Sequence, residues 1–289
     1  MAYKKTIMTD NINHLRQWIG KTESHEDLAT AFPVNALSAT LDRDDPPAKT
    51  GDAIPHSAHW LYFLETAANR ELGHDGHPKR GGFLPPVTLP RRMWAGGRID
   101  FRAPVRIGDA IRRDSEILSV EAKSGSSGNL VFVTVRHTVS ANGTVAIVEE
   151  HDIVYRDAAK KGAPPPAGKP APQNAAWRRE LETNEAVLFR YSALIFNAHR
   201  IHYDLDYCRD EEGYPGLIVH GPLQTTLLLD LCRRMDKRPV RRLDYRATHP
   251  IFHQEKFTVN GQPAADGSSV ELWTANAAGC YAMRGTATF

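Results

Sequence analysis

A stretch of twelve residues in the C-terminal half, FNAHRIHYDLDY, gathers side chains that can exchange protons. Within eight residues it holds Asn197, His199, His202 and Asp204. Shortly after it comes YPGLIVHGPL, which ends in His-Gly-Pro at 220–222, just before an apolar helical pattern. Histidine titrates at a pKa of ~6.5, so it can act as acid or base near neutral pH. The amides at a helix N-terminus can donate hydrogen bonds to a negatively charged oxygen, and Gly221 would let that oxygen approach the backbone closely.

Composition excludes several other classes of protein. The chain has 289 residues, 41% of them apolar, and a formal charge of +2, which argues against nucleic acid as the main partner. Its three cysteines have no CxxC spacing and indicate neither a zinc knuckle nor a disulfide framework. The N-terminus lacks a signal-peptide pattern, and no apolar run reaches the ~20 residues that span a bilayer. We therefore expect a soluble, cytoplasmic enzyme.

A proline-rich segment divides the chain. DAAKKGAPPPAGKPAPQNAAW, at 157–177, has no apolar period and is typical of a linker. The predicted organisation is an N-terminal domain at 1–156, a linker at 157–178 and a C-terminal domain at 179–289.

In the N-terminal domain the pattern predicts helices before strands. Two helices are expected near 11–20 and 27–41, and a long apolar helix at 56–72. A loop rich in Gly and Pro follows at 73–90. Alternating apolar residues then predict strands at 99–111, 115–124, 129–141 and 144–156.

The C-terminal domain repeats this order. A short strand is expected at 185–195 and a helix at 220–235, whose leucines share one face. Strands are expected at 244–252, 255–262, 270–277 and 280–289. The segments IDFRA and LDYRA occur at corresponding places in the two halves, which favours a structural duplication. We therefore predict an α+β double hot-dog fold, in which two long antiparallel sheets each wrap a helix.

The paired motifs resemble those of the MaoC-like enoyl-thioester hydratases. That family carries Asp-x-Asn-Pro-x-His-x-Asp followed by an apolar segment ending in His-Gly, and here FNAHRIHYD is followed by YPGLIVHGPL. The N-terminal domain, with HPKRGGFLPPVTLPRRMWAGGRIDF, resembles a narrower subgroup that includes itaconyl-CoA and mesaconyl-CoA hydratases and type 2 hydroxyacyl-thioester dehydratases. The resemblance covers nearly the whole chain.

The resemblance implies a catalytic set. The family's histidine falls on His202 and its His-Gly on 220–221, while the family's acid is replaced by Asn197 and its asparagine by His199. We expect His202 to perform acid–base work, Asn197 to orient water, and Gly221 to donate to the enolate oxygen. We interpret Asp204 as a helix cap.

The sequence narrows the choice of substrate-binding residues less than that of the catalytic residues. A second carboxylate on the acyl group would call for an arginine. The candidates for contact with the acyl group are His199, Tyr203, His220, Arg80, Arg92 and Arg98. The candidates for the coenzyme phosphates are Arg234, Lys237 and Arg241. Each of these arginines could instead be structural.

These features predict a hydratase or dehydratase that adds or removes water at C2–C3 of a short-chain acyl-CoA. The resemblance favours a branched C4-dicarboxylic acyl group, such as itaconyl or mesaconyl. Alternatives are a fatty-acid-type 3-hydroxyacyl-thioester dehydratase, a thioesterase, or a non-catalytic acyl-CoA-binding module. We expect no metal, no cofactor besides the coenzyme A of the substrate, no nucleic-acid or membrane partner, and a possible homo-oligomer.

Overall fold

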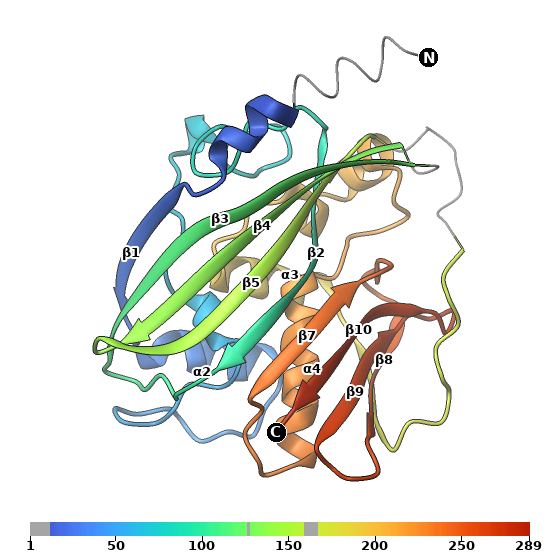
Figure 1. The fold of residues 1–289 in the computed structure, drawn as a ribbon. Coiled ribbons are helices and arrows are strands. Elements are labelled where there is room, and N and C mark those ends of the chain that lie inside the picture. Colours follow the sequence, from blue (N-terminus) through green and yellow to red (C-terminus); the bar gives the residue numbers. More distant parts are fainter. Residues whose placement is uncertain (1–11, 126–127, 159–166) are drawn as a thin grey trace.

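One antiparallel sheet of ten strands forms the frame of the molecule. The computed structural model describes residues 12–125, 128–158 and 167–289. The order across the sheet is β1-β3-β4-β5-β2-β7-β10-β9-β8-β6, as Figure 1 shows. The strands of the first half are β1 (Thr22–Leu28), β2 (Arg91–Phe101), β3 (Ala110–Gly125), β4 (Gly128–Ala141) and β5 (Thr144–Arg156). Those of the second half are β6 (Trp177–Glu182), β7 (Arg242–Ala247), β8 (Lys256–Pro263), β9 (Ser269–Ala275) and β10 (Tyr281–Thr288).

The two halves have the same strand order and meet at the β2–β7 pair. Read outward from this seam, the order is β2-β5-β4-β3-β1 on one side and β7-β10-β9-β8-β6 on the other. Ile99 pairs with Leu243, so the repeated segments IDFRA and LDYRA begin opposite each other and run in opposite directions. A Cβ at Gly97 would lie 2.8 Å from the Tyr245 hydroxyl, so the seam needs glycine here. The predicted duplication and the double hot-dog class are confirmed, but the two expected sheets are one continuous sheet.

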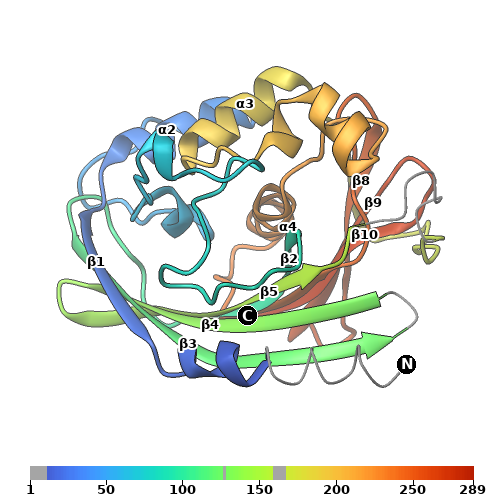
Figure 2. The ribbon, with the colours of Figure 1, turned by 90° about the horizontal axis from the view of Figure 1, so that it is seen from above.

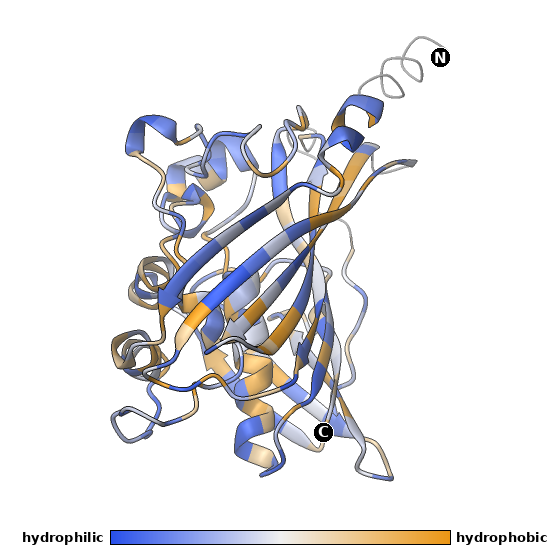
Figure 3. Cartoon of the chain, turned by 60° about the vertical axis from the view of Figure 1, so that its left-hand side comes forward, coloured by the Kyte–Doolittle hydropathy of each residue, from blue (hydrophilic) through white to orange (hydrophobic). Residues whose placement is uncertain are grey.

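A long buried helix belongs to the second half alone. Helix α4 (Gly221–Met235) packs against β6, β8, β9 and β10, and ten consecutive residues from Leu223 to Cys232 are buried. Figure 2 shows α4 enclosed between the sheet and two covering helices, α2 (Ala31–Thr40) and α3 (Glu185–Leu194). Figure 3 shows that α4 is largely hydrophobic and becomes hydrophilic at its C-terminal end.

The helix expected at 56–72 is wrong. This segment contains only two short 3-10 turns, η2 (Ala58–Leu61) and η3 (Asn69–Glu71). Ser57 and Phe63 have positive φ angles of 70° and 56°, which an α-helix cannot include. The apolar residues are buried without a regular helix, because contacts distant in sequence hold the backbone: the Phe63 N–H donates to Asp27 Oδ2 at 2.8 Å. Among the residues that the structure describes, the first half of the sheet therefore lacks a long helix over its inner face.

The strand expected at 185–195 is also wrong, because it forms α3. Asn184 caps this helix through its Oδ1, which accepts the Val187 N–H at 3.0 Å. Leu188, Tyr191 and Ser192 are buried on one face at helical spacing.

Other differences lie at element boundaries. Strand β1 occupies part of the region where only helices were expected. Strand β6 begins at Trp177, inside the predicted linker, and residues 159–166 of that linker lie outside the described residues. Helix α2 falls within the predicted range 27–41 and residues 12–15 are helical, whereas residue 11 lies outside the described part. Within the described residues, no helix is long and apolar enough to cross a membrane.

Truncating the core side of α4 should strongly destabilise the fold. Leu228 is fully buried, so Leu228→Ala is expected to lower the free energy of unfolding by about 2–5 kcal/mol. Met235 on the same helix is 49% exposed, and Met235→Ala serves as the matched control with a change below about 1 kcal/mol. Urea denaturation of both variants measures the difference, and equal losses would contradict the assigned burial.

Candidate active site

His202 is held as a neutral base at the end of a short 3-10 turn, η4 (Arg200–His202). It is buried, and its Nδ1 lies 2.8 Å from the backbone oxygen of Ile218. Because a carbonyl oxygen only accepts, Nδ1 carries the proton and Nε2 keeps its lone pair. Burial lowers the pKa of His202 to about 4, so the ring is neutral at pH 7.

The start of α4 lies against this imidazole. The ring of His220 stacks on His202 with centroids 3.6 Å apart, and its Nε2 lies 2.8 Å from Ser192 Oγ. Gly221 follows at the first position of α4, with Pro222 after it, and Gln224 makes the first helical bond, to His220 O. His202 and Gly221 both line one hollow over the seam of the sheet. The structure thus places a base beside free amides at a helix N-terminus.

Asn197 and His199 line the same hollow. The side-chain oxygen of Asn197 accepts the backbone N–H of His199 at 2.9 Å, which leaves the amide NH₂ as its free polar group. The ring of His199 lies edge-on to His202 with centroids 5.5 Å apart. Burial, followed by the neighbouring His77, holds the pKa of His199 far below its usual range.

Asp204 acts outside this hollow. One oxygen accepts the Tyr207 N–H at 2.9 Å, and the other accepts both Nε and Nη2 of Arg200. The interpretation of Asp204 as a cap is therefore confirmed.

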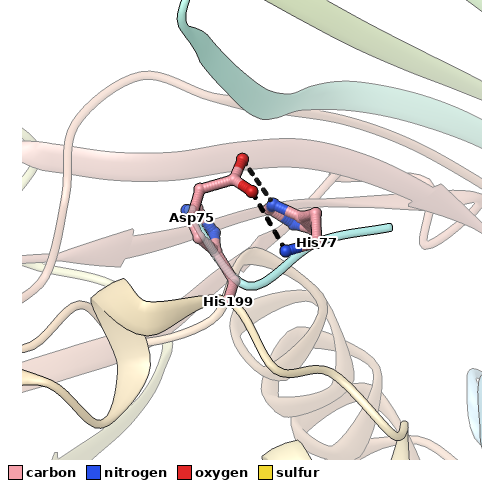
Figure 4. A group of neighbouring side chains, drawn as sticks. All are labelled: Asp75, His77 and His199. Atoms are coloured by element: carbon pink, nitrogen blue, oxygen red, sulfur yellow. Dashed lines mark hydrogen bonds and ion pairs between the residues drawn. The ribbon is translucent and has the colours of Figure 1, made fainter. Parts of the chain in front are cut away.

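Two residues of the first half, Asp75 and His77, lie next to these histidines, and neither was predicted from the sequence. Asp75 and His77 lie in the loop before β2, and Figure 4 shows them beside His199. The Nδ1 of His77 lies 3.1 Å from Asp75 Oδ2, and the His77 and His199 rings have centroids 4.0 Å apart. The only sequence signal was Asp-Gly-His in the loop GHDGHPKRGG, where a histidine two residues after an aspartate can bond to it.

The three candidate arginines have separate surroundings. Arg80 Nη1 donates to Val87 O at 2.7 Å and its Nη2 to Pro90 O at 2.6 Å, so it holds its own loop together. Arg98 donates to Asp152 and Glu150 on the outer face of the sheet, because its neighbour Ile99 faces the core. Arg92 lines the hollow and has no ion pair among the residues that the structure describes. We therefore retain Arg92 alone as the candidate cation for a substrate carboxylate.

The remaining candidates lie away from His202. Tyr203 is 51% exposed and does not line the hollow. Arg234 lies in the last turn of α4, about 20 Å from Gly221 at 1.5 Å per residue, and its Nε donates to the buried Asp230. Lys237 and Arg241 follow the C-terminal end of α4. Lys79 and Lys169 are among the other cations that line the hollow.

A second polar cluster covers the first half of the sheet where a long helix is lacking. The buried carboxylate of Glu149 lies 3.0 Å from His59 Nε2 and accepts the indole N–H of Trp60 at 2.9 Å. Burial alone would raise the pKa of Glu149, but the bond to His59, together with His59, His137 and His151 nearby, outweighs burial and lowers the pKa to about 2. Trp94 lies between this cluster and Gly221: its ring is 3.8 Å from that of His151. The hollow thus continues from His202 along the first-half sheet.

The fold and this site define the class of MaoC-like hydratases and dehydratases. The profile of the hydroxyacyl-thioester dehydratase type 2 family matches residues 57–253, and the chain belongs to this family. The chain is 45% identical to mesaconyl-C(4)-CoA hydratase of Chloroflexus aurantiacus over 260 residues, covering 88% of this chain and 91% of that protein. It is 26% identical to the mitochondrial hydroxyacyl-thioester dehydratase type 2 of Schizosaccharomyces pombe, covering 78% and 85%.

Solved structures agree on the fold. A MaoC-like dehydratase from Phytophthora capsici superposes with a TM-score of 0.71 at 12% identity, covering 96% of this chain and 97% of that one. HtdX of Mycobacterium tuberculosis gives a TM-score of 0.62 at 18% identity, covering 92% and 98%. Since the curated relatives are named hydratase and dehydratase, the chain is a hydro-lyase.

The buried histidines make stability sensitive to acid. The pKa values of His77, His151 and His202 are lowered to about 4, and that of His137 to about 3, in each case mainly by burial. As pH falls below about 6.5, the unfolded chain binds protons that the folded chain refuses. The free energy of unfolding should therefore fall between pH 6.5 and 4, with each group contributing on the order of 1 kcal/mol per pH unit.

Urea denaturation at pH 7.5, 6 and 5 measures this slope. In the variant His137→Asn the slope should be smaller, because one buried histidine no longer titrates. Stability that stays constant down to pH 4.5 would contradict the neutral, buried state of these rings.

Proposed function

We propose that this enzyme adds water across the double bond of an unsaturated C4-dicarboxylic acyl-CoA, with a mesaconyl unit esterified at C4 as the favoured substrate. The 45% identity to mesaconyl-C(4)-CoA hydratase over most of both chains supports this substrate class. In a mesaconyl-C4 thioester, the free carboxylate is bonded to the carbon that receives the hydroxyl group. Its counter-ion must therefore lie close to the catalytic base. Arg92, which lines the hollow with His77, His199 and His202, is the observation that carries the proposal.

The geometry suggests a role for each residue in the reaction. The Nε2 of His202 accepts a proton from water while the water oxygen bonds to the β carbon. The π electrons of the double bond then shift toward the thioester, and the resulting enolate oxygen accepts a hydrogen bond from Gly221 N–H. The α carbon takes a proton as the carbonyl re-forms. The NH₂ of Asn197 donates to the water oxygen and fixes its position.

The family match leaves a second candidate substrate, a longer 3-hydroxyacyl or enoyl thioester. The hollow extends past Val135, Val139 and Ile153 on the inner face of the first-half sheet, which gives apolar walls for a longer chain. Comparing mesaconyl-C4-CoA with crotonyl-CoA and a C8 enoyl-CoA distinguishes the two candidates, because only the diacid needs a cation beside the reacting carbon.

Replacing His202 should remove catalysis but not binding. We expect His202→Asn to lower kcat by about 10²–10⁴-fold, because the general base is lost, with a dissociation constant for free coenzyme A close to that of the native enzyme. Loss of the conjugated absorbance of mesaconyl-C4-CoA measures the rate. His74→Asn is the control, since the His74 side chain is 70% exposed. A native rate in His202→Asn would refute the assignment.

Replacing Arg92 should change substrate choice. Arg92→Met is expected to lower kcat/KM for mesaconyl-C4-CoA by about 10- to 100-fold, the value of a charge-assisted contact. The value for crotonyl-CoA should change little, since that substrate has no free carboxylate. Arg98→Met, on the outer face of the same strand, is the matched control. Equal losses on both thioesters would show that Arg92 acts on the fold instead of on the diacid.

A further inference from the structure

The proposed hydration creates a positive charge in a place that holds few counter-ions. When an imidazole takes a proton from water, a buried imidazolium forms, and a buried charge is costly unless it is paired. Nδ1 of His202 donates only to a neutral carbonyl. Asn197 occupies the position of the family's acid and cannot titrate, and Asp204 is bonded to Arg200 outside the hollow. The motif of the second half therefore contains no carboxylate that could stabilise the transferred proton.

A carboxylate does reach this group, but it comes from the first half. Both oxygens of Asp75 face His77: Oδ1 accepts the backbone N–H and Oδ2 lies at Nδ1, each at 3.1 Å. Burial alone would raise the pKa of Asp75, but the bonds from His77 and the charge of Arg92 outweigh it and lower the pKa to about 2. Asp75 is therefore anionic, and it keeps the proton of His77 on Nδ1 and the lone pair on Nε2.

Backbone contacts hold the loop of Asp75 and His77 against the segment that contains His199 and His202. The Arg200 N–H donates to Asp75 O at 2.9 Å. Gly76 has a φ of 86°, and a Cβ there would lie 1.8 Å from Ala198 O, so only glycine allows the two loops to touch. The ring of His77 lines the same hollow as His202, and it lowers the pKa of His202 as burial does, whereas the Ile218 bond raises that pKa.

We propose that Asp75 and His77 form a second proton-handling pair, contributed by the first half, which replaces the carboxylic acid absent at position 197. In this scheme the attacking water donates one hydrogen to each of two imidazoles, His202 and His77. As the O–H bond toward His202 breaks and the water oxygen bonds to the β carbon, the second hydrogen stays on the new hydroxyl group, where His77 Nε2 accepts its hydrogen bond. The anion of Asp75 offsets the charge of the imidazolium that forms on His202. This imidazolium then gives its proton to the α carbon, so that no net proton is gained or lost. This inference rests on the proposed hydration but not on the identity of the acyl group.

Asp75, His77 and His199 could also bind a metal ion, and this is the competing explanation for why they lie together. Ligand atoms of Asp75, His77 and His199 all lie within 4.8 Å of one another. Two observations favour the proton-handling pair. Both oxygens of Asp75 are already bonded to His77, and the positive charge of Arg92 acts on all three residues, which disfavours a cation between them.

The test compares Asp75→Asn and His77→Gln with native enzyme on mesaconyl-C4-CoA and on crotonyl-CoA. Each variant should lose about 10²–10³-fold in kcat on both thioesters, with KM and affinity for a saturated acyl-CoA nearly unchanged. The double variant should be no slower than either single variant, because the pair acts as one unit. Asp75→Glu should recover part of the rate, and the acid limb of the kcat–pH profile should move in Asp75→Asn. The charged and titratable groups that face His77 are Asp75, Arg92, Arg80, His199 and His202.

Matched controls lie in the same loop. Glu71→Gln and His74→Gln change exposed residues of the same types and should keep native rates. Native kcat in Asp75→Asn, losses that multiply in the double variant, or losses confined to KM would overturn the proposal. So would a native enzyme that loses activity in EDTA and regains it with Zn²⁺. If His202→Asn is inactive while Asp75→Asn is not, the hydratase function stands and this inference alone fails.

Discussion

The antiparallel pairing of β2 with β7 is the constraint on which the site depends. The loop containing Asp75 and His77 leads into β2, and α4 leads into β7. Pairing these two strands therefore places the end of one half's loop beside the start of the other half's helix. Gly97 makes the approach possible at the seam, and Gly76 makes it possible where the loops touch. The hollow is consequently a product of both halves, although the recognisable motif lies in only one.

Electrostatics inside the hollow follow from burial more than from net charge. The chain is nearly neutral overall, but the histidines over the seam are desolvated and stay uncharged at neutral pH. Asp75 and Arg92 are two charged groups among them, with opposite signs. A neutral imidazole next to a fixed anion can receive a proton, and an arginine next to it can hold an anionic substrate. Under the proposed function, this one small region supplies a base, its counter-ion and a cation for the substrate.

The sequence predicted the parts of the site that are local. His202, Asn197 and Gly221 lie within 25 residues, and their spacing carries the information. Asp75 was missed because its relation to His199 is purely spatial. Arg92 and Arg98 could not be separated either, since strict alternation puts them on the same face of β2. The register shift between Trp94 and Gly96 reverses the alternation, so that Trp94 and Arg92 face inward while Arg98 faces outward.

The secondary-structure predictions were correct where the hydrophobic pattern is long, and wrong where contacts distant in sequence or a capping residue determine the structure. Helix α4 and strands β3, β4, β5, β8, β9 and β10 followed from periodicity. Strands β1 and β6 were not predicted, and the strand expected at 99–111 covers only the last three residues of β2. The segment 56–72 has the composition of a buried helix, but distant contacts from Asp27 and Glu149 give it an irregular path. At 185–195, the Asn184 cap decides for helix over strand, and this signal is visible in the sequence.

The two halves share a strand order but differ in their helices. Two identical halves around the β2–β7 axis would produce two equivalent reaction centres, each confined by its own long helix. Here the first half has only the short turn η2 where the second half has α4. Divergence after duplication has thus left the described part of the chain with one long buried helix, beside a hollow whose lining comes from both halves.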